Sequence, residues 1–170
     1  MYCAMVEVLM ISYMEGIKDN IVSIVGDSLE DLRKRIIANH EAAGQVASGR
    51  TRDSLKVEST ENGGILWGRQ AFGVLEAGRK PGKVPKGFSD IILKWMDDKG
   101  ITVEHPKSFA YLVARKIANE GTLLYRSGKM DIYSTDVDET SKEIMNRVIG
   151  IFNTEVEHIN LNFSVNNENK

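Results

Sequence analysis

The chain has 170 residues, a formal net charge of −2 at pH 7 and 27% charged residues, which is typical of one globular, water-soluble domain. Proteins dedicated to nucleic-acid binding are usually basic overall, so positive charge in this chain has to act locally. The single cysteine, Cys3, excludes a disulfide framework within the chain and a thiolate-based zinc site.

The first segment, MYCAMVEVLMISYM (residues 1–14), is apolar but shorter than the stretch of about 20 residues that spans a bilayer. It contains Glu7 and has no basic leader, which argues against a signal peptide. We expect a buried strand or an oligomer contact here, within an N-terminal extension of residues 1–27. The alternative is that Met14 is the true start and that a weakly ordered extension precedes it.

A helix is predicted to begin at Ser28, which can act as its N-cap, with Asp31 three residues later in a shortened capping box. It opens an α+β domain over residues 28–165. An alternating segment, the turn signal Asn62-Gly63 and a second alternating segment then predict a β-hairpin near residues 54–69.

Two amphipathic helices are predicted next. The first begins near Phe88 and has Gly100 as its stop, and the second opens at Pro106 and stops at Gly121. Apolar spacing of three and four residues assigns the inward positions. These are Phe88, Ile91, Ile92, Trp95 and Met96 in the first helix, and Phe109, Leu112, Val113 and Ile117 in the second.

The C-terminal third predicts a second hairpin, a long helix and a strand. The hairpin, or an extended arm, is expected near residues 122–134, and the helix opens at Asp136 with Glu139 in capping-box spacing. A polar tail closes the chain at 166–170. The overall expectation is a single α+β domain with a small antiparallel sheet packed against several helices. The late strand has one apolar face: Ile159, Leu161, Phe163 and Val165.

No catalytic constellation is recognisable. The segment GQVASGRT (44–51) approaches a phosphate-loop pattern, but it follows a helix and leads towards a strand, the reverse of the order that the motif requires. His40, His105 and His158 lack metal-ligand spacing and are expected at the surface; a site of histidines and carboxylates is the alternative. We expect no catalytic residue, no metal and no cofactor.

The segment VLEAGRKPGKVPKG (74–87) concentrates positive charge in a stiff loop, because its prolines fix φ while its glycines permit sharp reversals. A solvated connector is one interpretation. The other is a surface for an acidic partner, either a protein face or a phosphate backbone, and we favour the protein face. The candidate basic residues are Arg50, Arg52, Arg79, Lys80, Lys83 and Lys86.

The order TRDSLKVE, GGILWGRQAFGVLEAGRKPGKVP, IILKWMDDKGI and SFAYLVARKIANEGT, within residues 28–135, resembles the tail-completion, or neck, proteins of tailed bacteriophages. The version here is similar to the branch found in phages of gut Bacteroidetes, including crAss-like phages. The positions that match the family pattern are Arg52, Ser54, Phe72, Glu76, Gly78, Trp95 and Gly121-Thr122.

This resemblance implies a structural virion protein that forms a homo-oligomeric ring at the neck, between the portal and the tail, around the DNA exit channel. Its partners would be the portal and other neck or tail proteins, with non-specific contact to channel DNA and none to a membrane, and assembly would take place in the host cytoplasm. The unpaired strand 159–165 would join neighbouring subunits. The main alternative is a nucleic-acid-binding accessory protein that uses the basic loop 79–86. A small enzyme and a toxin or antitoxin module are further classes that no residue pattern favours.

Overall fold

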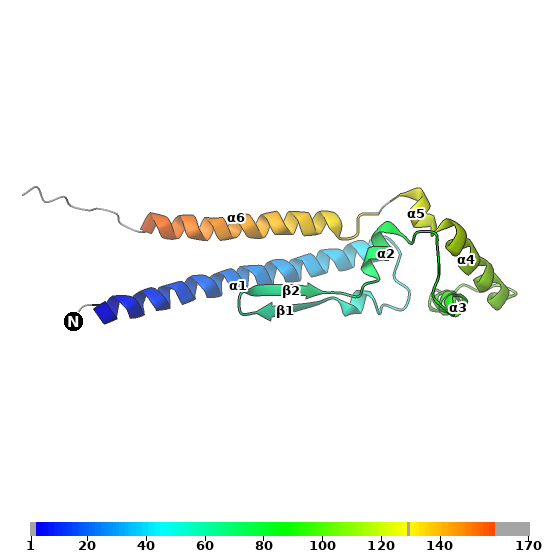
Figure 1. The fold of residues 1–170 in the computed structure, drawn as a ribbon, viewed down its shortest axis with the longest axis horizontal. Helices are drawn as coiled ribbons and strands as arrows, with labels where there is room; N and C mark the ends of the chain where they lie inside the picture. Colours follow the sequence, from blue (N-terminus) through cyan, green and yellow to red (C-terminus); the bar gives the residue numbers. More distant parts are fainter. Residues whose placement is uncertain (1–2, 129, 159–170) are drawn as a thin grey trace, which may run out of the picture.

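Two long helices, α1 (Cys3–Ala42) and α6 (Ser134–His158), lie side by side and run in opposite directions along the long axis of the molecule (Figure 1). The computed structural model describes residues 3–128 and 130–158, and side chains from residue 15 onward. A hairpin packs along α1, and the helices α3 to α5 gather at the end of the molecule away from the N-terminus (Figure 1).

Helix accounts for 65% of the structure, and a two-stranded antiparallel sheet completes a single α+β domain, as the sequence predicts. The intervening elements, in chain order, are η1 (Arg52–Ser54), β1 (Lys56–Thr60), β2 (Gly63–Trp67), α2 (Phe72–Ala77), α3 (Phe88–Asp98), α4 (Pro106–Glu120) and α5 (Leu123–Ser127).

The beginning of the chain differs from the prediction, because α1 runs without a break from Cys3 through residue 28. The expected strand is therefore wrong from residue 3 onward, and Ser28 does not cap a helix. Ser28 is instead buried, and its hydroxyl accepts a hydrogen bond from Arg147 Nη1 of α6 at 3.0 Å. Ile17, Ile21 and Ile24 continue the apolar spacing of the helix towards its N-terminus.

The first hairpin is confirmed. Strands β1 and β2 pair in antiparallel register, with Lys56 opposite Trp67 and Thr60 opposite Gly63. The two-residue turn is therefore Glu61-Asn62, one position before the predicted turn signal. The hairpin packs against α1, which gives its inner face a core to cover.

The predicted helices α3 and α4 are also confirmed, and they pack against each other. Their buried contact consists of Ile92 and Met96 of α3 against Ala110 and Ala114 of α4. Ile92 and Met96 are inward as predicted. On α4 the contact lies one position after the predicted Phe109 and Val113, because the two small alanines let the helix backbones approach closely. Among the predicted inward residues, these remain exposed: Ile91, Trp95, Phe109 and Leu112.

The second hairpin, predicted at 122–134, is wrong. Thr122 caps a short helix, α5, by accepting the backbone N–H of Tyr125 at 3.3 Å, and no strand occurs in the described residues of this segment. The threonine hydroxyl caps the helix locally, and this cap favours a helix where a strand was predicted. The predicted late strand at 159–165 lies outside the described residues.

Helix α6 begins at Ser134, two residues before the predicted start. Its first turn is held by Glu76 of α2, whose side chain is only 1% exposed and accepts the backbone N–H groups of Tyr133 at 3.0 Å and Ser134 at 3.1 Å. The hydroxyl of Ser134 also donates to this carboxylate. A buried acid far away in the sequence thus satisfies donors that a local cap was expected to satisfy.

Asp136, the predicted cap, bonds across to α1 instead. It accepts a hydrogen bond from Asn39 Nδ2 at 2.6 Å and pairs with Arg35 Nη1 at 3.2 Å. Arg35 also donates to the buried hydroxyl of Thr140. These contacts fix the register of α6 on α1 through specific polar pairs rather than through apolar packing alone.

A separate core joins α1, the hairpin and α2. Its buried members are Leu32 and Ile36 of α1 together with Leu55 and Phe72. The α3–α4 contact forms a second buried cluster. The molecule is therefore built around two small cores, and the surface between them is the place where a cleft opens.

Candidate functional site

The basic loop is anchored where it leaves α2. The backbone N–H of Arg79 donates to Thr122 Oγ1 at 2.9 Å, the N–H of Thr122 donates to the carbonyl of Arg79 at 3.0 Å, and Gly82 N–H donates to the carbonyl of Ala118 at 2.7 Å. The loop crosses the junction between α4 and α5 along this ladder of bonds. Its first half is therefore fixed to the body of the protein.

Two glycines make this crossing sterically feasible. Gly78 has φ +73° and Gly121 has φ +80°, a region that other residues rarely adopt. A Cβ at Gly121 would lie 2.7 Å from the carbonyl oxygen of Arg79, and a Cβ at Gly78 would collide with the backbone of Tyr125 and lie 2.6 Å from Thr122 Oγ1. The backbones approach closely here because both side chains are absent.

The four cations of the loop divide into two groups. Arg79 turns inward: its Nη2 donates to the carbonyl of Lys83 at 2.8 Å, and its guanidinium lies 5.5 Å from the ring centroid of Phe88. Lys80, Lys83 and Lys86 are exposed, and no described carboxylate lies within ion-pair distance of them. The loop thus uses one cation for rigidity and presents three to the solvent.

Arg50 and Arg52 do not join the loop lysines as one uncompensated patch. Arg50 lies 3.9 Å from Asp98, and Arg52 bonds Glu41 at 3.0 Å and Asp53 at 2.7 Å. The hydrogen bonds to Asp53 and Glu41 raise the pKa of Arg52 above its ordinary value. Acidic neighbours therefore offset both of these predicted basic residues.

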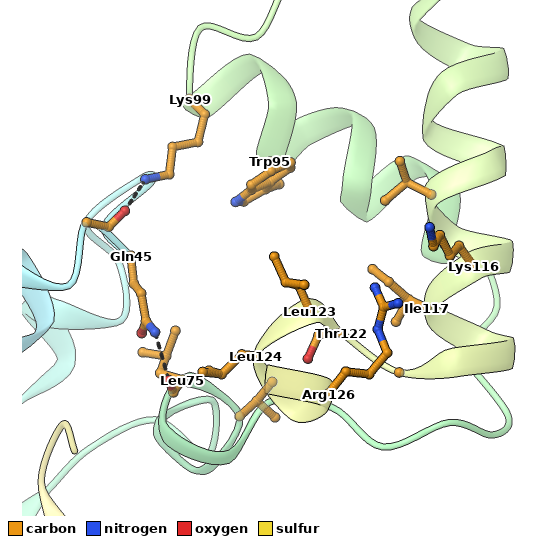
Figure 2. A pocket seen from close by; sticks show the side chains of 14 residues that line it. Gln45, Leu75, Trp95, Lys99, Lys116, Ile117, Thr122, Leu123, Leu124 and Arg126 are labelled. Carbon is orange, nitrogen blue, oxygen red and sulfur yellow. Dashed lines mark hydrogen bonds between the residues drawn. The ribbon is translucent and has the colours of Figure 1, made fainter. Parts of the chain in front are cut away.

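Beside the anchored loop lies an apolar cleft of about 780 Å³ (Figure 2). It opens between the end of α1 and the helices α2 to α5. Trp95 points into it from α3 and Leu123 from α5, opposite each other. The lining residues are Gly44, Gln45, Val74, Leu75, Trp95, Lys99, Val113, Lys116, Ile117, Gly121, Thr122, Leu123, Leu124 and Arg126.

Polar contacts fix one wall of the cleft. Lys99 Nζ donates to the carbonyl of Gly44 at 2.6 Å, and Gln45 Nε2 donates to the carbonyl of Leu75 at 2.9 Å (Figure 2). These two bonds attach the loop after α1 to α3 and to α2. The wall is therefore held in place before any ligand arrives.

The charged residues that line the cleft are all positive. Lys99, Lys116 and Arg126 contribute to its lining, whereas no aspartate or glutamate occurs among the described residues that line it. Arg126 forms an ion pair with Glu120 at 2.9 Å, and Lys116 has no ion-pair partner in the described part of the chain. An apolar floor under a cationic rim fits a partner with large apolar and acidic side chains.

His40 is buried, contrary to the expectation of a surface histidine. Its ring meets Phe72 in an edge-on contact at 5.8 Å, and neither ring nitrogen has a hydrogen-bond partner in the described structure. Burial lowers the pKa of His40; Glu41 opposes this shift, while Arg52 and Lys99 add to it. The buried ring packs as part of the core.

Within residues 3–128 and 130–158, no group of three or more histidine, cysteine, aspartate or glutamate side chains is arranged to hold a metal. The same part of the chain contains no helix with the length and apolar character of a membrane span. The predicted intersubunit residues Ile159, Leu161, Phe163 and Val165 lie beyond these ranges.

Comparison of the chain with protein-family models, with curated protein sequences and with solved structures gave no match.

Two parts of this site are not predicted from the sequence. Glu76 enters only as a position of the family pattern, although a lone acid within the apolar segment AFGVLEAG is a signal of a structural carboxylate. The cleft itself could not be found, because five segments distant in the sequence contribute to it.

Proposed function

We propose that this chain is a structural subunit that assembles into a homo-oligomeric ring, without catalytic residues and without a cofactor. The observation that carries this proposal is an uncovered apolar stripe on α6. Met145, Ile149, Phe152 and Val156 follow one another at intervals of four, three and four residues, and their exposed fractions are 62%, 49%, 49% and 63%. Such spacing places them on one helix face.

An uncovered stripe of large side chains is a common mark of an interaction surface, since burial of apolar area yields about 25 cal/mol per Å². Further large apolar side chains are exposed at the other end of the molecule, Leu123 and Tyr111 among them. Apolar surfaces at both ends suit a subunit that contacts two neighbours, as each member of a ring does.

The resemblance to tail-completion proteins suggests which ring this is: one at the neck of a tailed phage virion, between the portal and the tail, around the DNA channel. Three of the matching positions, Gly78, Gly121 and Thr122, meet in the anchored crossing of the basic loop, and a fourth, Glu76, holds the start of α6. Several of the matching positions thus make structural contacts in this chain, which supports the proposal that the motif is a structural one.

Deleting residues 159–165 tests the ring. These residues alternate apolar and polar, follow directly on α6, and are proposed to pair with a neighbouring subunit. We expect the deletion to abolish oligomers, seen in light scattering, while the helical circular dichroism signal stays. Removing only the polar tail, 166–170, is the matched control. Unchanged oligomers in the 159–165 deletion would refute the proposed role of this segment.

Nucleic-acid binding is the second candidate function, and the exposure of Lys80, Lys83 and Lys86 favours it. Each phosphate neutralised by such a cation contributes about −0.9 to the slope of log binding constant against log salt. If the loop binds DNA, replacing all three lysines by alanine should flatten that slope by up to about 2.7 on the same rule. A protein-docking loop instead predicts no steep slope in either protein.

A further inference from the structure

We infer that the cleft receives the last turns of α6 from a second copy of this chain, so that one end of each subunit docks on the opposite end of the next. The inference rests on the proposed homo-oligomeric function and names the contact that would build it. It concerns two surfaces that the described structure leaves uncovered.

The first surface is the floor of the cleft. Leu123 is 72% exposed and Trp95 is 42% exposed, although both face a cavity of about 780 Å³. Pockets of roughly 300–1,000 Å³ bury most of a compact, largely apolar ligand. Two large apolar side chains from a partner helix would enter this cavity and cover both residues.

The second surface is the last two turns of α6. Phe152 and Val156 project from it and are largely exposed, and Glu155 and Glu157 flank them. The C-terminal end of a helix carries a partial negative charge, so acids there are unfavourably placed. Neither glutamate has an ion-pair partner in the described residues, and a cationic surface on a neighbour would relieve this unfavourable charge.

The two surfaces complement each other in both polarity and charge. The cleft offers an apolar floor with Lys99, Lys116 and Arg126 around it and no acid. The end of α6 offers apolar side chains between two acids. Positive surface facing negative surface guides and orients association.

Their positions require two molecules. The end of α6 lies towards one end of the elongated subunit, and α3 to α5 gather at the other (Figure 1). The cleft is lined by residues of α3, α4 and α5, so it lies at that second end. A subunit that fills its neighbour's cleft keeps its own cleft open for the next, which is a head-to-tail contact. Contacts of this kind close into rings when the rotation between subunits permits.

A charge swap tests the contact. Lys116 and Glu157 are exposed and make no ion pair in the described structure, so Lys116→Glu and Glu157→Lys should leave the fold unchanged. Each single variant should weaken self-association about tenfold, as close interfacial charge pairs allow. The double variant should restore it. Lys56→Glu, on an exposed position of β1, is the matched control and should have no effect.

Cross-linking tests the same contact directly. In full-length chains in which Cys3→Ser removes the only cysteine, a Val156→Cys chain is mixed with a Leu123→Cys chain under mild oxidation. We expect a disulfide-linked dimer from this pair and none when Ser59→Cys, on the hairpin, replaces Leu123→Cys.

The outcomes separate this inference from the proposed function. Oligomers that form without the cross-link and ignore the charge swap would overturn the contact and leave the ring intact. A chain that is monomeric in light scattering, but still forms the cross-link in an amount that the charge swap changes, would overturn the ring and keep the contact as a weak one.

Discussion

The carboxylate of Glu76 accepts the backbone N–H of Ser134 at 3.1 Å, and this bond joins α2 to the first turn of α6. The acid is buried, and residue 133 donates to it as well. This side chain thus holds the start of the helix that carries the uncovered apolar stripe.

Replacing Glu76 by alanine should therefore destabilise the protein. The backbone donors at the start of α6 would lose a buried charged acceptor, a change that costs about 1–3 kcal/mol or more. We expect the loss in urea unfolding, accompanied by weaker docking of α6. Glu61→Ala, at the exposed hairpin turn, is the control and should change stability by less than about 0.5 kcal/mol. Equal stability of the two variants would contradict the capping role.

The crossing of the basic loop predicts a contrast between two glycines. Gly78→Ala forces a side chain into a left-handed conformation and against the α5 backbone, so it should destabilise by more than about 1 kcal/mol. Gly73→Ala, in α2, meets no atom within 4 Å and should be neutral or stabilising by up to about 1 kcal/mol. Thermal unfolding of both proteins measures the difference. A loop that is not anchored at this crossing predicts similar behaviour for the two.

His40 makes stability depend on pH. Because burial lowers the pKa of His40 in the folded protein below its ordinary value of 6.5, the unfolded chain binds the proton more readily. The neutral ring therefore contributes to the free energy of unfolding above about pH 6.5, and this contribution is lost as the pH falls below that value. Unfolding free energies measured between pH 5 and 8 should show this decline.

His40→Leu keeps an apolar side chain in the core and removes the titrating group, so the decline should flatten over this interval. The carboxylates titrate alike in both proteins and cancel in the comparison. A pH profile that is the same in the variant and the wild type would show that His40 is not protected from protonation.

The sequence predicts well those elements whose signals are local. Pro106 opens α4 and Gly121 ends it, as expected, and the hairpin turns at the two residues before Gly63. These features depend on backbone geometry within a few residues. The fold class follows from them, since helices around one small hairpin give an α+β domain.

The failures involve contacts between distant segments. Ser28 matches an N-cap pattern, but α1 continues through it, and its hydroxyl accepts a hydrogen bond from Arg147 of α6 instead. The segment after Thr122 is predicted as a hairpin or an extended arm, yet a local cap makes it helical and its start is bonded to the distant Arg79. The cleft depends on the relative placement of α2 to α5, which no local pattern encodes.

The native mass of the purified chain, measured by light scattering at low and at high salt, tests the central claim of self-assembly most directly. We predict a ring-sized species whose mass is a multiple of the 19.0 kDa subunit. The association between subunits should weaken at high salt, because salt screens the charged contact. A stable 19.0 kDa monomer that binds double-stranded DNA with a steep salt slope would contradict this account and favour the nucleic-acid-binding function.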